Sequence, residues 1–376
     1  MKPSLRILIT ADPVDGTWQY SLDLARGLFR LGHETVLALT GPAPAAEQMK
    51  AAAAVPGLRL VEAGLLLEGA GATEASMARA AGAIAAVAAE TEADIVQLNT
   101  PAFGAFGALA DFGRPVVAVV HSCIASRWEA VEGSSLPAEF EWRTDLVARG
   151  LRSAGAVVAP TSAFAASVKR HYGLKTVPRT VHHGRSPVAV PNGVPHDFVF
   201  TAGRLWDEGK NFGMIDAAAA RIGVPVRAAG PLAGPNGAKV LFDNIHCLGT
   251  LGDEELGRWL SARPVFVSAA LHEPFGLAVL EAASAGCALI LSDIPSFREL
   301  WEEVAIFVDP RDEDGFARAI GNLVGDDFER AVLGRAARER AERYTPDAMA
   351  AQMAAVYRGL LPAVHRPVLA AARAAA

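Results

Sequence analysis

The sequence is poor in cysteine and lacks the cysteine spacings typical of metal sites. Its three cysteines, Cys123, Cys247 and Cys287, are far apart and form neither a CxxC pair nor a mixed Cys/His motif. An odd number of cysteines in apolar surroundings favours buried thiols over a disulfide framework. We therefore expect a protein of a reducing compartment, and no motif requires a metal.

Long hydrophobic runs are also missing. No uninterrupted stretch of about 20 apolar residues is available to span a bilayer. The apolar run at residues 5–10 is too short for the hydrophobic region of a signal peptide, and no cleavage site follows it. The sequence thus predicts a cytoplasmic location by default and contains no clear membrane anchor.

Positive charge is not in excess. The chain has 35 Lys and Arg residues against 41 Asp and Glu residues, which gives a formal net charge of −6. A dedicated nucleic-acid-binding protein would carry a basic footprint, so we expect no nucleic-acid partner. Local clusters of basic residues are still compatible with the binding of small phosphorylated ligands.

Short apolar segments alternate with helical patterns along the 376-residue chain. This length exceeds the usual size of one hydrophobic core. Strands joined by helices form mostly parallel sheets through right-handed crossovers, which predicts an α/β fold class. The predicted strands are residues 5–10, 34–39, 93–98, 115–120 and 156–161 in the first half, and residues 197–203, 224–230, 244–249, 264–269, 287–292 and 304–309 in the second.

A break separates the two halves. Between residues 177 and 197, six Pro and Gly residues interrupt any regular element. We therefore predict two doubly wound, Rossmann-like domains at residues 1–185 and 186–352. The first contains a helix stopped by Gly32, with these apolar residues on one face: Trp18, Leu22, Ala25, Leu28 and Phe29. A crossover helix is expected at residues 77–89.

Two glutamates follow the predicted strand at residues 264–269. Glu273 lies in the next loop, and Glu281 lies eight residues later on a predicted helix bracketed by Pro274 and Gly286. Ligands of doubly wound sheets bind at the carboxyl ends of the strands, so both carboxylates are site candidates. Taken alone, the pair is equally compatible with a functional site and with a structural alternative. In that alternative, one glutamate complements the helix dipole and the other faces solvent.

The start of the same predicted helix is a candidate anion site. The backbone N–H groups of Phe275, Gly276 and Leu277 are expected to lack partners within the helix. Gly276 would let the backbone approach a phosphate or a sugar closely.

Two cations follow the first predicted strand of the second domain. Arg204 and Lys210 together supply the charge and the directed donors that a diphosphate requires. The alternative is a solvated loop in which Arg204 pairs with Asp207 or Glu208.

Together, GRLWDEGKN (residues 203–211) and HEPFGLAVLEAASAG (residues 272–286) resemble the signature segments of retaining glycosyltransferases of family 4, which have the GT-B architecture. The resemblance covers nearly the whole chain and includes Gly32-His33, His121-Ser122 and Tyr344-Thr345-Pro346. It implies an acceptor-side domain and a donor-binding domain that face across a cleft. It also implies a C-terminal helix, at about residues 353–376, that packs back on the first domain.

The resemblance assigns roles to five side chains. It implies that Arg204 and Lys210 bind the donor diphosphate, that Glu273 approaches the donor sugar, and that Glu281 hydrogen-bonds the ribose. His121 resembles the family's histidine near the reacting sugar, where a neutral imidazole could bind the sugar or position the acceptor. Its structural alternative is a histidine that satisfies a loop carbonyl.

Backbone contacts and loops complete the implied site. The amides of residues 275–277 would contact the sugar and the phosphates, and Thr250 and Leu251 lie in the segment that reads the base. Gly16 and Thr17 are candidates for the acceptor and phosphate loop, although the family often has paired glycines there. A further departure is the sequence His183-Gly184-Arg185 where an Asn-Gly-Arg type is usual, with Asn192-Gly193 nearby.

The function implied is transfer of a sugar from a nucleoside diphosphate sugar to a carbohydrate, lipid-linked or small-molecule acceptor, with the configuration retained. The nucleotide sugar is a co-substrate, no cofactor or metal is required, and peripheral membrane contact stays open. The alternatives are a sugar-nucleotide epimerase or hydrolase of related architecture and an inactive nucleotide-sugar-binding protein. A nicotinamide dehydrogenase is disfavoured because no GxGxxG follows the first strand.

Overall fold

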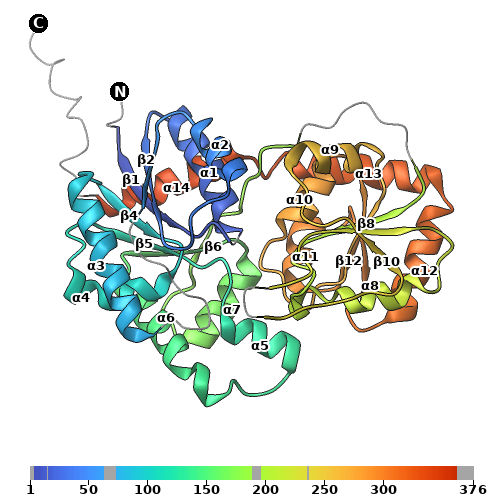
Figure 1. The fold of residues 1–376 in the computed structure, drawn as a ribbon, viewed down its shortest axis with the longest axis horizontal. Coiled ribbons are helices and arrows are strands. Elements are labelled where there is room, and N and C mark those ends of the chain that lie inside the picture. The colour runs from blue at the N-terminus through green and yellow to red at the C-terminus, as the bar shows by residue number, and fades with distance from the viewer. Residues whose placement is uncertain (1–3, 15, 63–72, 189–195, 235–236, 362–376) are drawn as a thin grey trace, which may run out of the picture.

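The computed structural model describes residues 4–14, 16–62, 73–188, 196–234 and 237–361, which form two lobes (Figure 1). Each lobe is built around one parallel β-sheet with helices on both faces. The helices are α1 (Thr17–Arg30), α2 (Ala46–Ala53), α3 (Glu74–Glu90), α4 (Gly107–Ala110), α5 (Ile124–Glu132), α6 (Glu141–Ser153), α7 (Ser162–Tyr172), α8 (Phe212–Ala219), α9 (Asp253–Ser261), α10 (Leu277–Ser284), α11 (Pro295–Trp301), α12 (Glu313–Val324), α13 (Asp327–Ala341) and α14 (Pro346–Leu360).

The first lobe contains seven strands in the order β3-β2-β1-β4-β5-β6-β7. Alternate side chains of its central strand enter different cores: Ile7 and Ile9 pack with α1 and α14, and Leu8 packs with α3. Burial on both faces explains why the strand reads as a continuous apolar run. The strands are β1 (Arg6–Ala11), β2 (Glu34–Leu39), β3 (Leu58–Glu62), β4 (Ile95–Leu98), β5 (Val116–Val119), β6 (Ala156–Ala159) and β7 (Arg179–Thr180).

The second lobe contains six strands in the order β10-β9-β8-β11-β12-β13. In each sheet the strand order reverses once at the centre, between β1 and β4 and between β8 and β11. Such switch points open a crevice at the carboxyl ends of the strands. The strands are β8 (Val199–Ala202), β9 (Val226–Ala229), β10 (Ile245–Cys247), β11 (Val265–Ser268), β12 (Ala288–Ser292) and β13 (Ile306–Val308).

All eleven predicted strands are present, and the predicted α/β class is confirmed. The strands β3 and β7 were not predicted. Both lie at the edges of the first sheet, and the residues of β3 are only partly buried or exposed. An edge strand with little burial lacks the apolar run by which the central strands are recognised.

Helix α1 corrects one prediction about the first lobe. It runs from Thr17 to Arg30, and Gly32 follows with φ of +81°. Trp18 and Leu22 are buried as expected, but Phe29 is 45% exposed and does not belong to the apolar face. The crossover helix predicted at residues 77–89 is α3.

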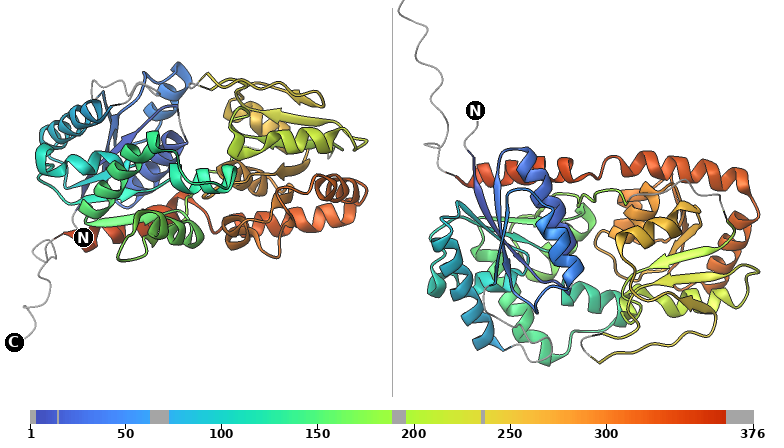
Figure 2. Two further views of the ribbon diagram at one scale, coloured as in Figure 1. Left: turned by 90° about the horizontal axis from the view of Figure 1, so that it is seen from below. Right: turned by 45° about the horizontal axis from the view of Figure 1, so that its top comes forward.

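The last described helix, α14, packs against α1 at the opposite end of the sequence (Figures 1 and 2). Its side chains Met353 and Tyr357 are fully buried in the first lobe. The helices approach closely at Gly27, where a Cβ atom would lie 2.5 Å from Ala350 Cβ and 2.5 Å from Pro346 O. Helix α14 therefore returns the chain from the second lobe to the first.

The segment that connects β7 to β8 contains the predicted domain boundary at residues 185 and 186, which stays a prediction. Residues 181–188 are described, whereas Asn192 and Gly193 lie outside the described residues. The same holds for residues 362–376, the last part of the segment expected to pack back on the first domain.

The cysteines form no disulfide. Cys123 and Cys287 are buried, and Cys247 is partly buried. In the described part of the chain, no helix combines the length and the apolar character needed to cross a membrane.

Candidate active site

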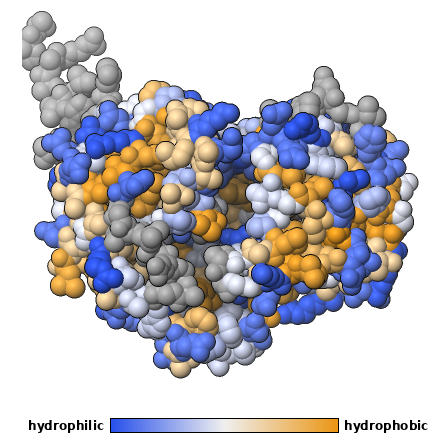
Figure 3. Space-filling view, in the orientation of Figure 1, coloured by the Kyte–Doolittle hydropathy of each residue, from blue (hydrophilic) through white to orange (hydrophobic). Residues whose placement is uncertain are grey.

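A cavity of about 620 Å³ lies between the lobes, where the surface is hollowed (Figure 3). Its walls are the loops that follow β1, β4 and β5 in the first lobe and β8 and β11 in the second. Both switch points thus open onto one space. The predicted site residues that line it are Gly16, Thr17, His121, Arg204, Lys210, Glu273, Phe275, Gly276 and Leu277.

Three predicted donor-site residues do not belong to the wall of this cavity. Thr250 is exposed in the turn after β10, and Leu251 packs against the core of the second lobe. Glu281 lies farther along α10 and is 15% exposed. The structure therefore separates the two glutamates that are eight residues apart in the sequence.

Lys210 and Glu273 lie side by side in the part of the cavity wall that the second lobe forms. Lys210 Nζ donates a hydrogen bond to Glu273 Oε2, and the two side chains form an ion pair. Both lie at loops that follow central strands, β8 and β11, so the parallel sheet brings them together. The pair places one cation and one carboxylate at the same point of the cavity.

Arg204 is held by Asp207, as the structural alternative for this residue anticipated. Arg204 Nη2 lies 2.8 Å from Asp207 Oδ2, and Arg127 of α5 approaches the other oxygen at 2.9 Å. Burial alone would raise the pKa of Asp207, but hydrogen bonds and charge from Arg204 and Arg127 lower it to about 2. Because Arg204 also lines the cavity, the ion pair orients this cation at the wall.

Helix α10 begins later than predicted. Its cap is Gly276 with φ of +93°, and the first intrahelical hydrogen bond runs from Leu280 N to Gly276 O at 3.1 Å. Phe275 and Gly276 therefore precede the helix, and the N–H groups of the first turn begin at Leu277. Leu277 and Ala278 line the cavity, so the positive end of this helix faces it.

His121 is bonded to protein groups through both ring nitrogens. Its Nε2 lies 3.1 Å from Asn99 Oδ1, and its Nδ1 lies 3.2 Å from His183 Nε2. Asn99 Oδ1 already accepts from Gln97 Nε2, so the consistent arrangement has His121 donating from Nε2 and accepting at Nδ1. Burial and the nearby imidazoles of His121 and His182 lower the pKa of His183 well below its ordinary value.

The loop after β1 gives weaker support to its predicted residues. Thr17 is the first residue of α1, and its Oγ1 lies 3.4 Å from Asp12 N. At Gly16, φ is −60° and no atom lies within 4 Å of a Cβ built there. The backbone at this position does not require glycine, so the ligand role of Gly16 stays a prediction.

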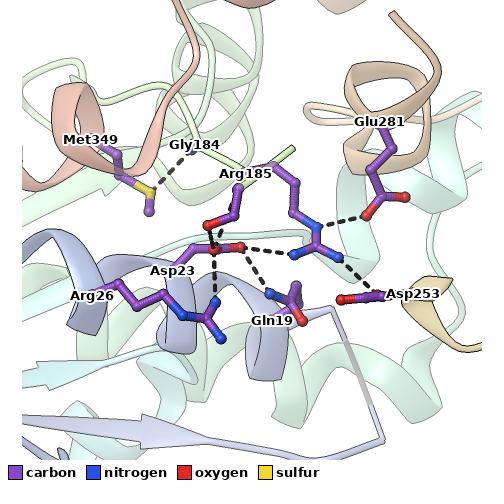
Figure 4. Close-up of polar contacts among 9 residues, drawn as sticks. Gln19, Asp23, Arg26, Gly184, Arg185, Asp253, Glu281 and Met349 are labelled. Atoms are coloured by element: carbon purple, nitrogen blue, oxygen red, sulfur yellow. Dashed lines mark hydrogen bonds and ion pairs between the residues drawn. The ribbon is translucent and has the colours of Figure 1, made fainter. Parts of the chain in front are cut away.

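Glu281 is bound by Arg185, which comes from the segment after β7 (Figure 4). Arg185 Nε lies 2.6 Å from Glu281 Oε1, and its other two nitrogens contact Asp23 of α1 and Asp253 of α9. Burial raises the pKa of Glu281, and the charge and hydrogen bond of Arg185 oppose this rise. One guanidinium thus joins the two lobes beside the cavity.

The described residues contain no group of three His, Cys, Asp or Glu side chains arranged to hold a metal ion. The Asp, Glu, Lys and Arg residues that line the cavity are Asp12, Arg127, Arg143, Arg204, Asp207, Lys210 and Glu273.

Matches to known sequences cover most of the chain. A family model described as Glycosyltransferase Family 4 matches residues 14–197, and one described as Glycosyl transferases group 1 matches residues 195–326. The chain belongs to the family 4 glycosyltransferases. The resemblance of the segments at residues 203–211 and 272–286 is confirmed.

Individual members of the family are distant relatives. A D-inositol 3-phosphate glycosyltransferase of Streptomyces scabiei is 26% identical over 285 residues, or 65% of this chain and 63% of that protein. The O-antigen chain mannosyltransferase B of Escherichia coli is 33% identical over 88 residues, which is 23% of each chain. The matches thus span less than two thirds of the lengths of these curated glycosyltransferases.

Solved structures share the two-lobed architecture. Sucrose-phosphate synthase from Thermosynechococcus elongatus has a TM-score of 0.75 at 20% identity, covering 95% of this chain and 99% of that one. Anabaena HepE, solved in complex with UDP and glucose, has a TM-score of 0.72 at 17% identity, covering 95% and 100%. At these identities the likeness shows the fold, and the predicted GT-B architecture is confirmed.

Several residues at or near this candidate site were not predicted from the sequence. Asn99 and His183 bind His121, Arg127 binds Asp207, and Asp23 with Arg185 forms the cluster around Glu281. The only local signal was the departure at His183-Gly184-Arg185 from the family's usual sequence. The other residues meet their partners only through tertiary contacts.

Proposed function

We propose that the protein transfers a sugar from a nucleoside diphosphate sugar to an acceptor, with retention of configuration at the anomeric carbon. The observation that carries this proposal is the convergence of Arg204, Lys210, Glu273 and the start of α10 on one cavity between the lobes. A diphosphate leaving group requires cations and N–H donors, and its sugar requires a carboxylate that accepts hydrogen bonds from hydroxyl groups.

In the proposed reaction, the bond between the anomeric carbon and the phosphate oxygen breaks, and the diphosphate leaves with its electron pair. The acceptor hydroxyl attacks the same face of the sugar, and its proton passes to the departing phosphate oxygen. No side chain becomes a covalent nucleophile, and Glu273 orients the sugar. Arg204, Lys210 and the N–H groups of α10 stabilise the charge that develops on the diphosphate.

His121 is proposed to position the reacting sugar or the acceptor. Its two ring nitrogens contact Asn99 and His183, so a direct hydrogen bond to the sugar requires the exchange of one of these partners. The alternative within the same proposal is that His121 contributes shape and a neutral wall to the cavity.

The names of relatives guide the choice of substrates. HepE was solved with UDP and glucose. Other relatives are named O-antigen chain mannosyltransferase B, phosphatidyl-myo-inositol mannosyltransferase and D-inositol 3-phosphate glycosyltransferase. We therefore propose UDP-sugars and mannosyl donors as first candidates, with carbohydrate, lipid-linked and phosphorylated polyol acceptors. The reaction is placed in the cytoplasm, with peripheral membrane contact if the acceptor is a lipid.

The deciding experiment combines donor binding with product analysis. A panel of nucleotide sugars is screened by thermal shift, and each binding donor is incubated with acceptors and examined by mass spectrometry. The Arg204→Ala variant is expected to lower kcat by about 100- to 1,000-fold, because a preorganised donor to the leaving group is lost. The surface variant Arg298→Ala, which removes contacts with Asp293, Glu302 and the Phe307 ring away from the cavity wall, serves as the control.

Each product pattern has a distinct meaning. A glycosylated acceptor with the donor's anomeric configuration supports the proposal, and an inverted product contradicts retention. Free sugar or an epimer would indicate hydrolysis or epimerisation, and tight nucleotide binding without turnover would indicate a binding protein. Transfer is expected to continue in EDTA, because side chains and N–H groups neutralise the diphosphate.

A further inference from the structure

Three charged side chains from separate parts of the chain meet between the lobes (Figure 4). Asp23 belongs to α1, Arg185 to the segment that connects the lobes, and Glu281 to α10. The exposed fractions of these side chains are 0%, 6% and 15%, respectively. Charges this deeply buried are retained only where partners compensate for their lost hydration.

The guanidinium of Arg185 is fixed by three carboxylates. Its Nε contacts Glu281 at 2.6 Å, its Nη1 contacts Asp23 at 3.4 Å, and its Nη2 contacts Asp253 at 3.2 Å. Because each nitrogen group meets a different acid, rotation of the planar fork would break at least one contact. Arg185 therefore holds one orientation toward Glu281.

Asp23 is itself held from several sides. Its Oδ1 accepts from Ser186 Oγ at 2.6 Å and from Arg26 Nη1 at 3.0 Å, and its Oδ2 accepts from Gln19 Nε2 at 2.9 Å. The cluster therefore contains two cations, Arg26 and Arg185, and three carboxylates. Asp23 anchors the cluster in the first lobe, although Glu281 belongs to the second lobe.

Only one oxygen of Glu281 is engaged in this cluster. Arg185 binds Oε1, and no second hydrogen bond to Glu281 occurs among the described residues. The side chain retains partial exposure, so Oε2 remains able to accept a hydrogen bond.

We propose that Arg185 is a positioning residue for the nucleotide donor, which orients Glu281 from the first lobe so that Oε2 can accept from the ribose. This inference rests on the proposed function, in which Glu281 binds the ribose hydroxyls. It adds that donor affinity depends on Asp23 and Arg185, two residues outside the cavity wall.

The electrostatics of the cluster support this role. Burial raises the pKa of Glu281, Arg185 lowers it, and the nearby carboxylates of Asp253 and Asp23 raise it. Without Arg185, the remaining effects, burial and the two nearby carboxylates, all raise the pKa of Glu281. A protonated Glu281 loses acceptor strength, so nucleotide binding should weaken further as the pH falls.

The test measures dissociation constants of UDP and GDP by calorimetry for the full chain and its variants. The ratio of the Arg185→Gln constant to the wild-type constant is followed between about pH 6 and pH 8.5, because the ratio cancels the titration of the nucleotide's own phosphate. We expect a ratio of about ten near neutral pH, since a charge-assisted contact that orients an acceptor is lost. The ratio should grow as the pH falls.

Two further variants separate positioning from folding. Arg185→Lys keeps the charge but not the fork, so it should restore a pH-independent ratio while recovering only part of the affinity. Asp23→Asn should weaken binding in the same direction, because Arg185 loses its first-lobe partner. The matched control is Arg330→Gln, which removes a buried arginine that pairs with Asp197 and Asp327 and does not line the cavity. Its nucleotide affinity should equal that of the wild type.

The outcomes distinguish the two proposals. If the wild type binds neither UDP nor GDP nor any nucleotide sugar of the donor panel, the proposed function fails and this inference fails with it. If the wild type binds but the Arg185→Gln ratio is one at every pH, only the inference about Arg185 is overturned. A ratio below one also overturns it, since Arg185 would then compete with the ribose for Glu281.

Discussion

The two glutamates that lie eight residues apart, Glu273 and Glu281, acquire different cations in the folded chain. Glu273 pairs with Lys210 of its own lobe at the cavity wall, and Glu281 pairs with Arg185 of the connecting segment. In both cases the partner is far away in the sequence. Glu273 and Glu281 therefore lie in two distinct electrostatic environments, although they are close in the sequence.

Asp207 makes an acid-sensitive contribution to stability. Its folded-state pKa of about 2 is below its ordinary value of 3.8, so the contribution is complete above the ordinary value and is lost as the pH falls through about 2. We expect the Asp207→Asn variant to be about 2 kcal/mol less stable than the wild type near neutral pH. The difference should shrink between pH 4 and pH 2 in urea denaturation followed by tryptophan fluorescence.

Asp293→Asn is the control for this measurement. Asp293 pairs with Arg298 at the surface, where both side chains are substantially exposed. Exposed pairs contribute less than about 1 kcal/mol. A constant gap between the wild type and Asp207→Asn at all pH values would contradict the assigned ionisation.

At the scale of elements, close approach determines how the terminal helices pack. Helix α14 lies against α1, and Gly27 leaves no room for a side chain between them. We expect Gly27→Ala to destabilise the protein by about 1–3 kcal/mol, because the added methyl group overlaps Ala350 and the carbonyl of Pro346. Thermal or urea unfolding measures this loss.

Gly82 provides the matched control on another helix. It lies on α3, and no atom is within 4 Å of a Cβ built there. Gly82→Ala should leave stability unchanged or raise it by up to about 1 kcal/mol, because alanine favours the helix. Equal losses for both variants would show that α14 does not approach α1 as described.

The lobes of the whole molecule are bridged beside the cavity by polar contacts. Arg127 reaches Asp207, and Ser126 Oγ lies 3.0 Å from His272 Nε2. Burial lowers the pKa of His272 to about 4, so its neutral ring can accept from the hydroxyl group. On the opposite side, Glu299 accepts from Ser162 N at 2.8 Å.

These bridges predict how the arrangement of the lobes responds to substitution. Arg127→Ala removes one cation from the bridge at Asp207, so the lobes should separate more readily. We expect the radius of gyration of this variant in X-ray scattering to exceed that of the wild type. Addition of a nucleoside diphosphate should reduce the difference. The kcat of the variant should fall more than its nucleotide affinity, because the reaction needs both lobes.

The outward-facing variant Arg149→Ala serves as the control for scattering. Arg149 pairs with Glu74 and Asp145 within the first lobe, at exposed positions. Its radius of gyration should match that of the wild type. If Arg127→Ala also matches it with and without nucleotide, the bridge does not control closure.

Much of the site was predictable because parallel sheets place their functional residues at strand ends. The apolar runs at β8 and β11 located Arg204, Lys210 and Glu273, and burial on both faces made those runs visible. The edge strands β3 and β7 were missed because they lack that signal. The start of α10 was placed too early because Gly276 adopts a positive φ that no periodicity reveals.

The sequence by itself determined the two α/β halves, the family, and the positions of the cations and glutamates, since these depend on local periodicity and on contiguous motifs. Only the tertiary structure decided which charges meet. Asp23, Arg185 and Glu281 are separated by 162 and 96 positions along the chain, and burial makes their pairing obligatory once the lobes come together. A pairing that arises from burial between distant segments has no signature in the neighbourhood of either residue.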